Sequence, residues 1–438
     1  MRQGGEPIEK QLVPHAQDLA IRQSGTRVRL FAQSHYLEAF REPETVWLSP
    51  PAGSVGPGPS DDRMYAIDPV GKNAPYEFPV LPPWRGPVYP PVEPDPDGHF
   101  DYLEVNTREF VVAHMYGGIR RTLDIWEGYL GRRIEWQFRP HFQRMELVPV
   151  LDWDNAHAGY GFIETGFGPS QTGEAQPYSL NFDVLAHELG HSIVFAEVDY
   201  DAATLTGEYL GFQEAMGDLI ALVSALHFDS VVDQTLFSSR GNLYAENETN
   251  RLGELSDSAQ VRIASNSRKL SEFEQGWSNP HDLGLPLVGA VFDCLVDVYQ
   301  DHLLRAGLID PGLVRLMEMT PYEDLDEGLV HARYAEAYRG RHEGFKLALI
   351  EARDYIGHCM AAVMTGTSPH WLRYADVGRT LLAADRRFSG GRFQDQFFEN
   401  LSWRDIGTAA VGPRLPKDED DESRAQGIPA GSSCTAGQ

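Results

Sequence analysis

Apolar residues recur with two different periods in the first half of the chain. Between Thr107 and Leu130 the spacing is helical, which predicts one long and well-buried helix. The stretch at 145–168, MELVPVLDWDNAHAGYGFIETGFG, alternates and is broken by glycines, as is typical of short strands and hairpins. A further strand is predicted over Arg27–Gln33. This half of the chain is therefore expected to mix helix and sheet.

From Phe182 onward the apolar pattern becomes largely helical. The predicted fold class is accordingly α+β, with a β-containing N-terminal lobe and a mainly helical C-terminal lobe. The strongest helices are expected at 182–198, 210–227, 285–306, 343–364 and 373–387.

Proline, glycine and charge suggest where these units begin and end. Residues 49–60, SPPAGSVGPGPS, have the composition of a connector, and the prolines between Tyr76 and Pro96 predict an extended segment across the surface. The tail contains the charged run KDEDDESR and is expected to be disordered. The predicted units are an N-terminal extension with its connector (1–60), an α/β lobe (61–181), a helical lobe (182–411) and the tail (412–438).

Composition narrows the class of protein. Hydrophobic residues make up 42% and charged residues 23% of the chain, as in globular proteins, and no run of eighteen apolar residues predicts a membrane span. The net charge of −27 argues against nucleic acid as a partner. The three cysteines have no spacing typical of disulfide frameworks or thiolate metal sites. Because the start MRQGGEPIEK lacks a signal-peptide pattern, a cytoplasmic location is expected, with secretion by another route left open.

The segment 181–192, NFDVLAHELGHS, contains an HExxH pattern inside a helical apolar period. Residues four apart share a helix face, so His187 and His191 can bind one ion while Glu188 lies beside it. Neutral imidazoles suit zinc, and a third protein ligand leaves one position for water. Two alternatives are a chance match and a helix whose histidines only pack.

A second helical segment supplies carboxylates. Glu214 follows His191 by 23 residues, and Asp218 lies one turn further on the same face. Glu214 can complete a His2Glu zinc site, and Asp218 can accept the remaining N–H of a ligating histidine. An exposed acidic face is the simpler alternative, which the apolar neighbours disfavour.

This HExxH and ExxxD arrangement resembles the thermolysin-type metallopeptidases of the gluzincin group. The resemblance implies His187, His191 and Glu214 as zinc ligands, Glu188 as general base and Asp218 as partner of the first histidine. It covers roughly Asp101 to Ile309 and resumes at 374–407, which resembles the closing helices of thermolysin and fungalysin relatives.

Other positions are implied by the same resemblance. Asn155 and Ala156 match the edge strand along which an extended peptide substrate binds. His281, in a loop before an apolar helix, matches the histidine that donates to the oxyanion. Arg251 lies near the position of an arginine that binds a substrate carbonyl, and Tyr209 is a candidate phenol for the transition state.

Calcium is a further cofactor that the family suggests. Asp183 matches an acidic position of a family calcium site, and it equally suits the start of a helix as an N-terminal charge. The other calcium-binding carboxylates do not align, so the sequence leaves calcium open.

The sequence therefore predicts a zinc metalloendopeptidase, with its metal in a cleft between the two lobes and a peptide or protein as substrate. Glu188 would take a proton from water and pass it to the departing amine. Two alternatives stay open, which are a zinc hydrolase of a non-peptide substrate and a non-catalytic binding protein on the same fold. The sequence does not predict the oligomeric state.

Overall fold

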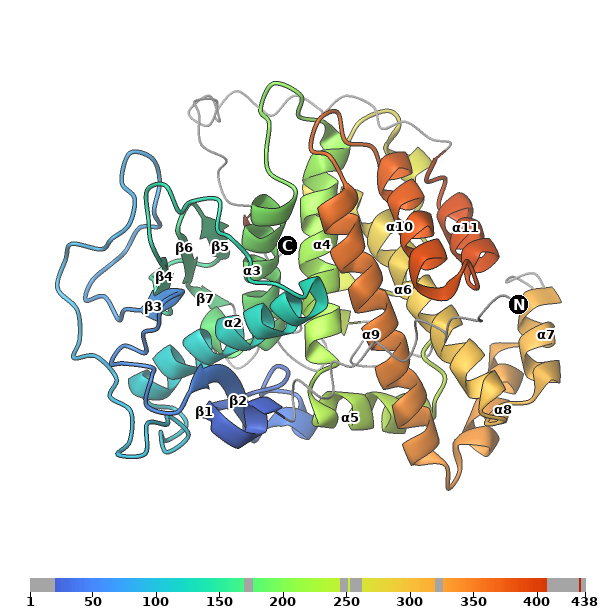
Figure 1. Cartoon of the computed structure of the whole chain (residues 1–438), viewed down its shortest axis with the longest axis horizontal. Coiled ribbons are helices and arrows are strands. Elements are labelled where there is room, and N and C mark those ends of the chain that lie inside the picture. The colour runs from blue at the N-terminus through green and yellow to red at the C-terminus, as the bar shows by residue number, and fades with distance from the viewer. Residues whose placement is uncertain are drawn as a thin grey trace, which may run out of the picture.

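The computed structural model describes residues 20–168, 176–244, 251–252, 262–319, 326–407 and 433–434. The strands of the N-terminal half gather on one side, and the helices of the C-terminal half form the other (Figure 1). The predicted α+β class, with a β-containing N-terminal part and a mainly helical C-terminal part, is confirmed. The predicted disordered tail lies outside the described residues except for Ser433–Cys434, which form a short strand instead. Residues 1–19 of the predicted extension also lie outside them.

The main sheet has five strands in the order β11-β5-β6-β4-β3. β3, β4 and β6 run parallel, whereas β5 is antiparallel to β6 and to β11. Nearly all residues of β4, β5 and β6 are buried, so elements cover both faces of this sheet. The strands are β3 (Met64–Ala66), β4 (Met145–Val148), β5 (Ala156–Gly159), β6 (Phe162–Thr165) and β11 (Ser433–Cys434).

Three small antiparallel pairs accompany the sheet. The predicted strand at Arg27–Gln33 is present in its first part, because β1 ends at Leu30, and β1 pairs with β2 in a hairpin. The pairs are β1 (Gly25–Leu30) with β2 (Glu44–Pro51), β7 (Phe167–Gly168) with β8 (Gln176–Pro177), and β9 (Arg251–Leu252) with β10 (Arg262–Ile263).

The long predicted helix is α2 (Arg108–Leu130). Its first turn is capped by the Thr107 hydroxyl, which accepts from the amide of Phe110, and it ends at Gly131 in the left-handed conformation, as is common at helix ends. Every residue from 110 to 126 is buried, because α2 lies between the β1–β2 hairpin and the helices α3 and α9 (Figure 1). This helix connects the two halves of the molecule.

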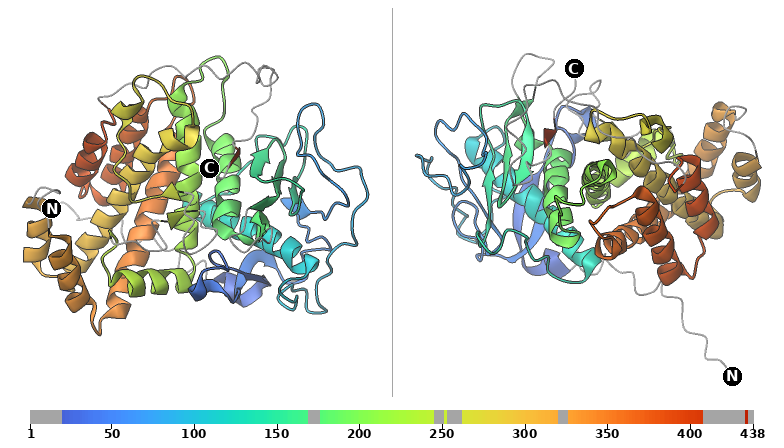
Figure 2. Two further views of the ribbon diagram at one scale, coloured as in Figure 1. Left: turned by 180° about the vertical axis from the view of Figure 1, so that it is seen from behind. Right: turned by 90° about the horizontal axis from the view of Figure 1, so that it is seen from above.

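The C-terminal half is built almost entirely from helices (Figure 2). The five predicted helices are all present, although the third of them, α6, begins at Pro280 and not at 285. Pro280 lies in the first turn of α6, where backbone N–H groups have no partner within the helix, so its missing N–H breaks no helical hydrogen bond. The Asn279 side chain caps the start of α6. The helices are α3 (Phe182–Glu197), α4 (Gly207–Ala225), α5 (Asp229–Ser239), α6 (Pro280–Arg305), α7 (Pro311–Met319), α8 (Glu327–Tyr338), α9 (His342–Gly366), α10 (Tyr374–Ser389) and α11 (Gln394–Trp403).

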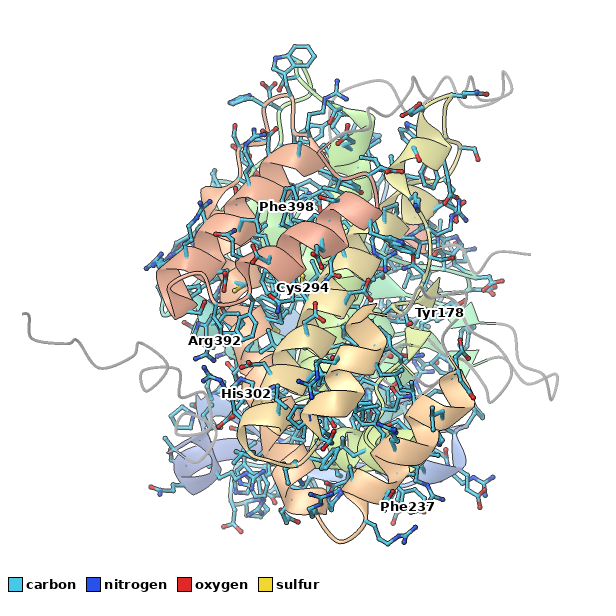
Figure 3. All side chains as sticks on the ribbon, turned by 90° about the vertical axis from the view of Figure 1, so that its right-hand side faces the viewer. Tyr178, Phe237, Cys294, His302, Arg392 and Phe398 are labelled. Carbon is cyan, nitrogen blue, oxygen red and sulfur yellow. The ribbon has the colours of Figure 1, made fainter. Side chains whose placement is uncertain are left out.

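One continuous hydrophobic core runs through both halves. It includes Val28 of β1, Met145 of β4, Leu189 of α3 and Val288 of α6. Figure 3 shows the helical side, where the fully buried Cys294 of α6 lies beneath α11. The helices that carry the predicted metal ligands therefore lie inside a packed core.

The described helices include no single one that is long and apolar enough to cross a membrane. The pair α4 and α5 meets those criteria together, with a bend of 94° between the two helices.

Candidate metal centre

Helix α3 carries the HExxH segment. The Asn181 side chain caps it by accepting from the amides of Asp183 and Val184, and all of its residues from 182 to 194 are buried. His187, Glu188 and His191 are 0–1% exposed. The predicted placement of these three residues on one buried helix is what the structure shows.

Helix α4 lies directly against α3. Two glycines make this close approach possible: a Cβ on Gly190 would lie 2.9 Å from the Cα of Gly217, and a Cβ on Gly217 would lie 2.8 Å from the His187 ring. Both distances are shorter than real Cβ contacts, so larger residues there would push the helices apart. Glu214 and Asp218 flank Gly217 on α4 and thereby reach the histidines of α3.

Three side-chain atoms converge between these helices. The Nε2 atoms of His187 and His191 are 3.0 Å apart. The Glu214 Oε2 lies 3.5 Å from the His187 Nε2 and 3.9 Å from the His191 Nε2. A point therefore exists about 2.0 Å from all three atoms, the distance at which zinc binds imidazole nitrogen and carboxylate oxygen. His187, His191 and Glu214 are hereafter called the metal cluster, and the fit to zinc is good. Among the described residues this is the one group of three or more histidine, cysteine or acidic side chains that could hold a metal ion.

The contact of His187 with Asp218 indicates which nitrogen of the neutral His187 ring carries the proton. The His187 Nδ1 lies 2.8 Å from the Asp218 Oδ1. A carboxylate has no proton to donate, so Asp218 in this form accepts the hydrogen bond and the imidazole donates it. The proton of the neutral ring is therefore on Nδ1, and the lone pair of Nε2 points toward the convergence point.

His191 is oriented by a chain of hydrogen bonds that the sequence did not reveal. The Tyr209 hydroxyl donates to the Asp199 carbonyl at 2.7 Å and accepts from the Gln213 amide nitrogen at 2.9 Å. This leaves the Gln213 Oε1 facing the His191 Nδ1 at 3.4 Å, so the proton of that ring also lies on Nδ1. Tyr209 is 1% exposed and supports Gln213 from behind the ligands, which favours a packing aromatic over a phenol aimed at the transition state. In the sequence, the polar residue Gln213 directly before the ligand Glu214 was the feature that could have indicated this partner of His191.

The two lone pairs define what the cluster can bind. Lone pairs on nitrogens 3.0 Å apart repel each other, and a cation between them removes that repulsion. Burial lowers the pKa of His191 to about 4, so its imidazole is neutral near pH 7. Burial acts to raise the pKa of Glu214, but His281 and His191 hold it well below its usual value, so this ligand is a carboxylate.

His281 lies in the first turn of α6 and not in a loop as predicted. The Asn279 side chain accepts from its amide, and its Nδ1 lies 2.6 Å from the Glu214 Oε2. Helices α4 and α6 approach closely at Gly284, where a Cβ would meet the Ala215 nitrogen at 3.1 Å. The structure therefore brings His281 to the metal cluster through a direct contact with a ligand.

Asn155 and Ala156 lie at the start of β5, next to α3. The Asn155 side-chain oxygen accepts from the Ala156 amide at 2.9 Å, and the Asn155 carbonyl accepts from the Gly166 amide at 2.8 Å. Ala156 packs with Tyr178 and with Val184, which lies one turn before His187 on α3. The predicted edge strand is thus adjacent to the metal-binding helix.

Two other predicted residues have backbone or side-chain partners of their own. Arg251 is in β9 and pairs with Ile263 of β10, and its side chain lies outside the described part of the structure. The Asp183 Oδ1 accepts from the Gln33 amide at 2.9 Å, which ties the start of α3 to the segment after β1. This contact gives Asp183 a structural role at the helix start.

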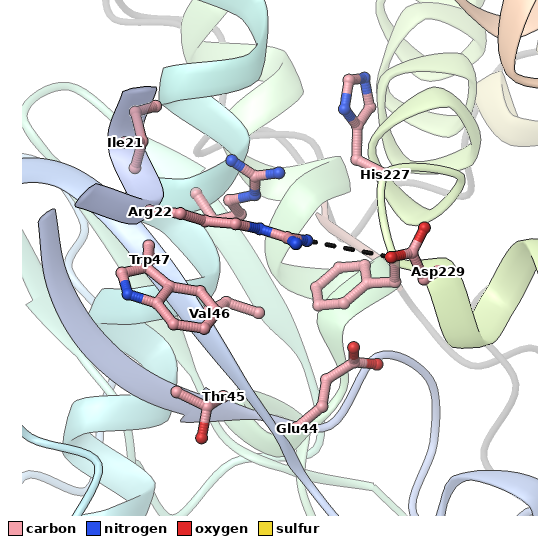
Figure 4. Close-up of a pocket in the computed structure, with 10 residues that line it drawn as sticks. Ile21, Arg22, Glu44, Thr45, Val46, Trp47, His227 and Asp229 are labelled. Atoms are coloured by element: carbon pink, nitrogen blue, oxygen red, sulfur yellow. Dashed lines mark ion pairs between the residues drawn. The ribbon is translucent and has the colours of Figure 1, made fainter. Parts of the chain in front are cut away.

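A separate small cavity lies between β2 and the start of α5 (Figure 4). Its volume is about 40 Å³, and Arg22 and Asp229 form an ion pair of 3.9 Å across it. Burial raises the pKa of Glu44 on its wall. Because the space suits one or two water molecules, this cavity is not a site for a peptide.

Comparison with known proteins gives little beyond this geometry. No model of a protein family matches the chain, and no curated protein matches it. One solved structure that is similar is the precursor of protealysin, a metalloproteinase from Serratia proteamaculans, with 14% sequence identity and a TM-score of 0.38. The match covers 79% of this chain and 87% of that chain. With so low a similarity, the chemistry of the metal cluster is what points to a function.

Proposed function

We propose that this chain is a zinc-dependent metalloendopeptidase that hydrolyses peptide or protein substrates. One observation supports this proposal most: two imidazole nitrogens and a carboxylate oxygen converge on one point about 2.0 Å from each. Two nitrogens and one carboxylate oxygen are donors that suit zinc better than calcium or magnesium, which prefer oxygen ligands alone.

In the proposed reaction, zinc would activate the water and the carbonyl, and side chains of the protein would move the proton and orient the metal ligands. When bound, zinc lowers the pKa of a water molecule and polarises the carbonyl to be cleaved. Glu188 is buried and directly follows His187 on α3, where it would take the proton of the attacking water and pass it to the departing amine. His187 and His191 are held for their task by Asp218 and Gln213.

His281 is the proposed electrophilic group. With its Nδ1 against the Glu214 carboxylate, its Nε2 is the ring atom left for the oxyanion, and it would donate there in the imidazolium form, in which both ring nitrogens carry a proton. Its side chain is 12% exposed, whereas those of His187 and His191 are 1% and 0% exposed, so His281 is the more accessible to a substrate.

The substrate would bind in an extended conformation along β5. Ala156 lies beside the metal-binding helix, so a peptide paired with this strand would run past the metal cluster. Arg251 stays a proposed contact of a substrate carbonyl.

The test is elemental analysis of the purified protein together with cleavage of casein and of a quenched peptide library, with and without chelator. We expect one zinc per chain and chelator-sensitive cleavage. His187→Ala should lose both the metal and the activity, whereas His331→Ala, a histidine on α8 outside the cluster, should keep both. Zinc without cleavage of any peptide would contradict the peptidase assignment and favour a hydrolase of another substrate. A protein that binds no divalent metal would refute the proposal as a whole.

A further inference from the structure

The sheet neighbour of β5 comes from the far end of the sequence. β11 pairs antiparallel with β5, with Ser433 opposite His157 and Cys434 opposite Ala156. Figure 2 shows this short dark-red strand beside the green strands of the sheet. Without β11, β5 would be the edge of the sheet, because its other side is taken by β6.

An edge strand with unpaired main-chain groups binds other extended segments. The β5 sequence, AHAG, is made mostly of very small residues, and the segment around β11, AGSSCTAG at 430–437, is small and uncharged. Small side chains let two backbones pair without steric conflict, and neither strand has a charge of the same sign to repel the other. The β5 edge and this segment are therefore compatible in size and charge.

The pairing lies where the proposed substrate would bind. Ala156, opposite Cys434, packs with Val184 on the helix that carries His187 and His191. A substrate strand and β11 need the same main-chain groups of β5, so the two cannot be bound at once.

We propose that the strand Ser433–Cys434 is an internal occupant of the peptide-binding edge of β5, which an extended substrate must displace. This inference rests on the proposed peptidase function and adds a form of self-regulation to it.

The connection within one chain makes this occupancy effective even though the strand is short. Twenty-five residues, 408–432, separate the end of the described helical part from Ser433 in the sequence. A chain of that length reaches at most about 90 Å, and tethering gives an effective concentration on the order of millimolar. Two paired residues form few hydrogen bonds, so the occupant is expected to leave and return and to reduce substrate affinity without abolishing it.

The experiment uses the full chain in three forms, each also carrying Glu188→Gln so that bound peptide is not cleaved. The first is otherwise unchanged, the second carries Ser433→Pro and Cys434→Pro, and the control carries Ser423→Pro and Arg424→Pro. Proline removes the main-chain donor that strand pairing needs, and the control introduces the same number of prolines outside β11. The readouts are hydrogen exchange at the amides of 156–157, with 158–159 as an internal reference, and the affinity of a labelled peptide with the sequence of residues 428–438.

We expect faster exchange at 156–157 and about tenfold tighter peptide binding for the β11 variant alone, since the competing strand has been removed. Excess unlabelled peptide should slow the exchange again, which shows that β5 is still folded. In forms that keep Glu188, the same two prolines should lower KM about tenfold and leave kcat nearly unchanged.

Equal exchange and equal affinity in all three forms would overturn the proposal. The binding readouts do not need turnover, so a failure of the proposed function is recognised separately. Differences in exchange and affinity without cleavage of any peptide would contradict the peptidase assignment and still support the occupancy of β5 by this segment.

Discussion

The contacts of two buried clusters of ionisable residues in the described part of the chain differ in kind. The metal cluster brings together lone pairs of two imidazoles and a carboxylate. The second cluster, hereafter the sheet cluster, surrounds the carboxylates of Glu146 and Glu164 on β4 and β6, which are 1% and 0% exposed.

The sheet cluster contains its own cation and its own donors. The Lys72 Nζ lies 2.8 Å from the Glu164 Oε2 and 3.9 Å from the centroid of the Tyr76 ring. The hydroxyls of Tyr65 and Tyr76 donate to Glu146 at 2.6 and 2.5 Å. Buried charge of this kind is neutralised within the protein and holds the segment at 72–84 against the sheet.

This contrast shows how a metal site can be recognised among buried charges. Burial alone does not distinguish the two clusters, because both lie inside the protein. What distinguishes them is that two imidazole nitrogens and a carboxylate oxygen converge on a common point in the metal cluster, whereas the carboxylates of the sheet cluster are met by an ammonium group and two hydroxyls. The comparison can be tested at both clusters.

The largest effect is expected from Glu188→Gln, which tests whether the metal cluster is catalytic. The amide cannot take a proton, so cleavage should fall by roughly 10²–10⁴-fold while bound zinc stays at one per chain. Elemental analysis and the quenched-peptide assay measure the two quantities, with Glu336→Gln on the surface of α8 as the control. Unchanged cleavage would remove Glu188 from the mechanism.

Lys72→Met tests whether the sheet cluster is structural. Removing the cation leaves the buried Glu164 carboxylate undercompensated, and the free energy of unfolding should fall by about 3–5 kcal/mol. Urea denaturation measures this change, and zinc content should be unaffected. The double variant Lys72→Met with Glu164→Gln should recover part of the loss. A drop in zinc content in the single variant, with stability unchanged, would reverse the roles of the two clusters.

Asp218→Asn probes the orientation of a ligand. An amide at this position accepts less strongly from the His187 Nδ1, so zinc affinity should fall by roughly 10–100-fold with the fold intact. Competition with a chelator of known affinity measures the change, and Asp395→Asn on α11 is the exposed control. Equal affinities for all three proteins would show that Asp218 does not tune the metal site.

The smallest effect is expected in the pH dependence of the stability of the metal-free protein. Burial holds the pKa of His191 at about 4 and that of His114 at about 3, whereas the unfolded chain titrates near 6.5. The unfolded state therefore binds more protons as pH falls below about 6.5, and stability should decline by at most about 1.4 kcal/mol per pH unit for each histidine. Denaturation midpoints at pH 7.5, 6.5 and 5.5 test this, and a midpoint that rises toward pH 5.5 would contradict it.

The sequence predicted those parts of the site that depend on spacing along a helix. His187 and His191 are four residues apart and Glu214 and Asp218 are four residues apart, and a helix alone places each pair on one face. The long helices were predicted for the same reason, since their apolar period is local information.

The remaining features depend on contacts between distant segments. His281 meets Glu214 only because α4 and α6 approach closely at Gly284, and Gln213 is oriented through a carbonyl on a loop before α4. The ion pair of Lys72 with Glu164 joins residues far apart in sequence. β11 is only two residues long and pairs through the backbone, so no side-chain pattern could predict it.

The close crossing of α3 and α4 has a consequence for protein engineering. A metal centre of this kind begins with the spacing of two backbones, because Gly190 and Gly217 let the helices come near enough for side chains of fixed length to meet. Transplanting the histidines and the glutamate onto a helical hairpin of ordinary width would separate them by more than one ion can span. A designer would therefore choose the glycine pair first and the ligands second.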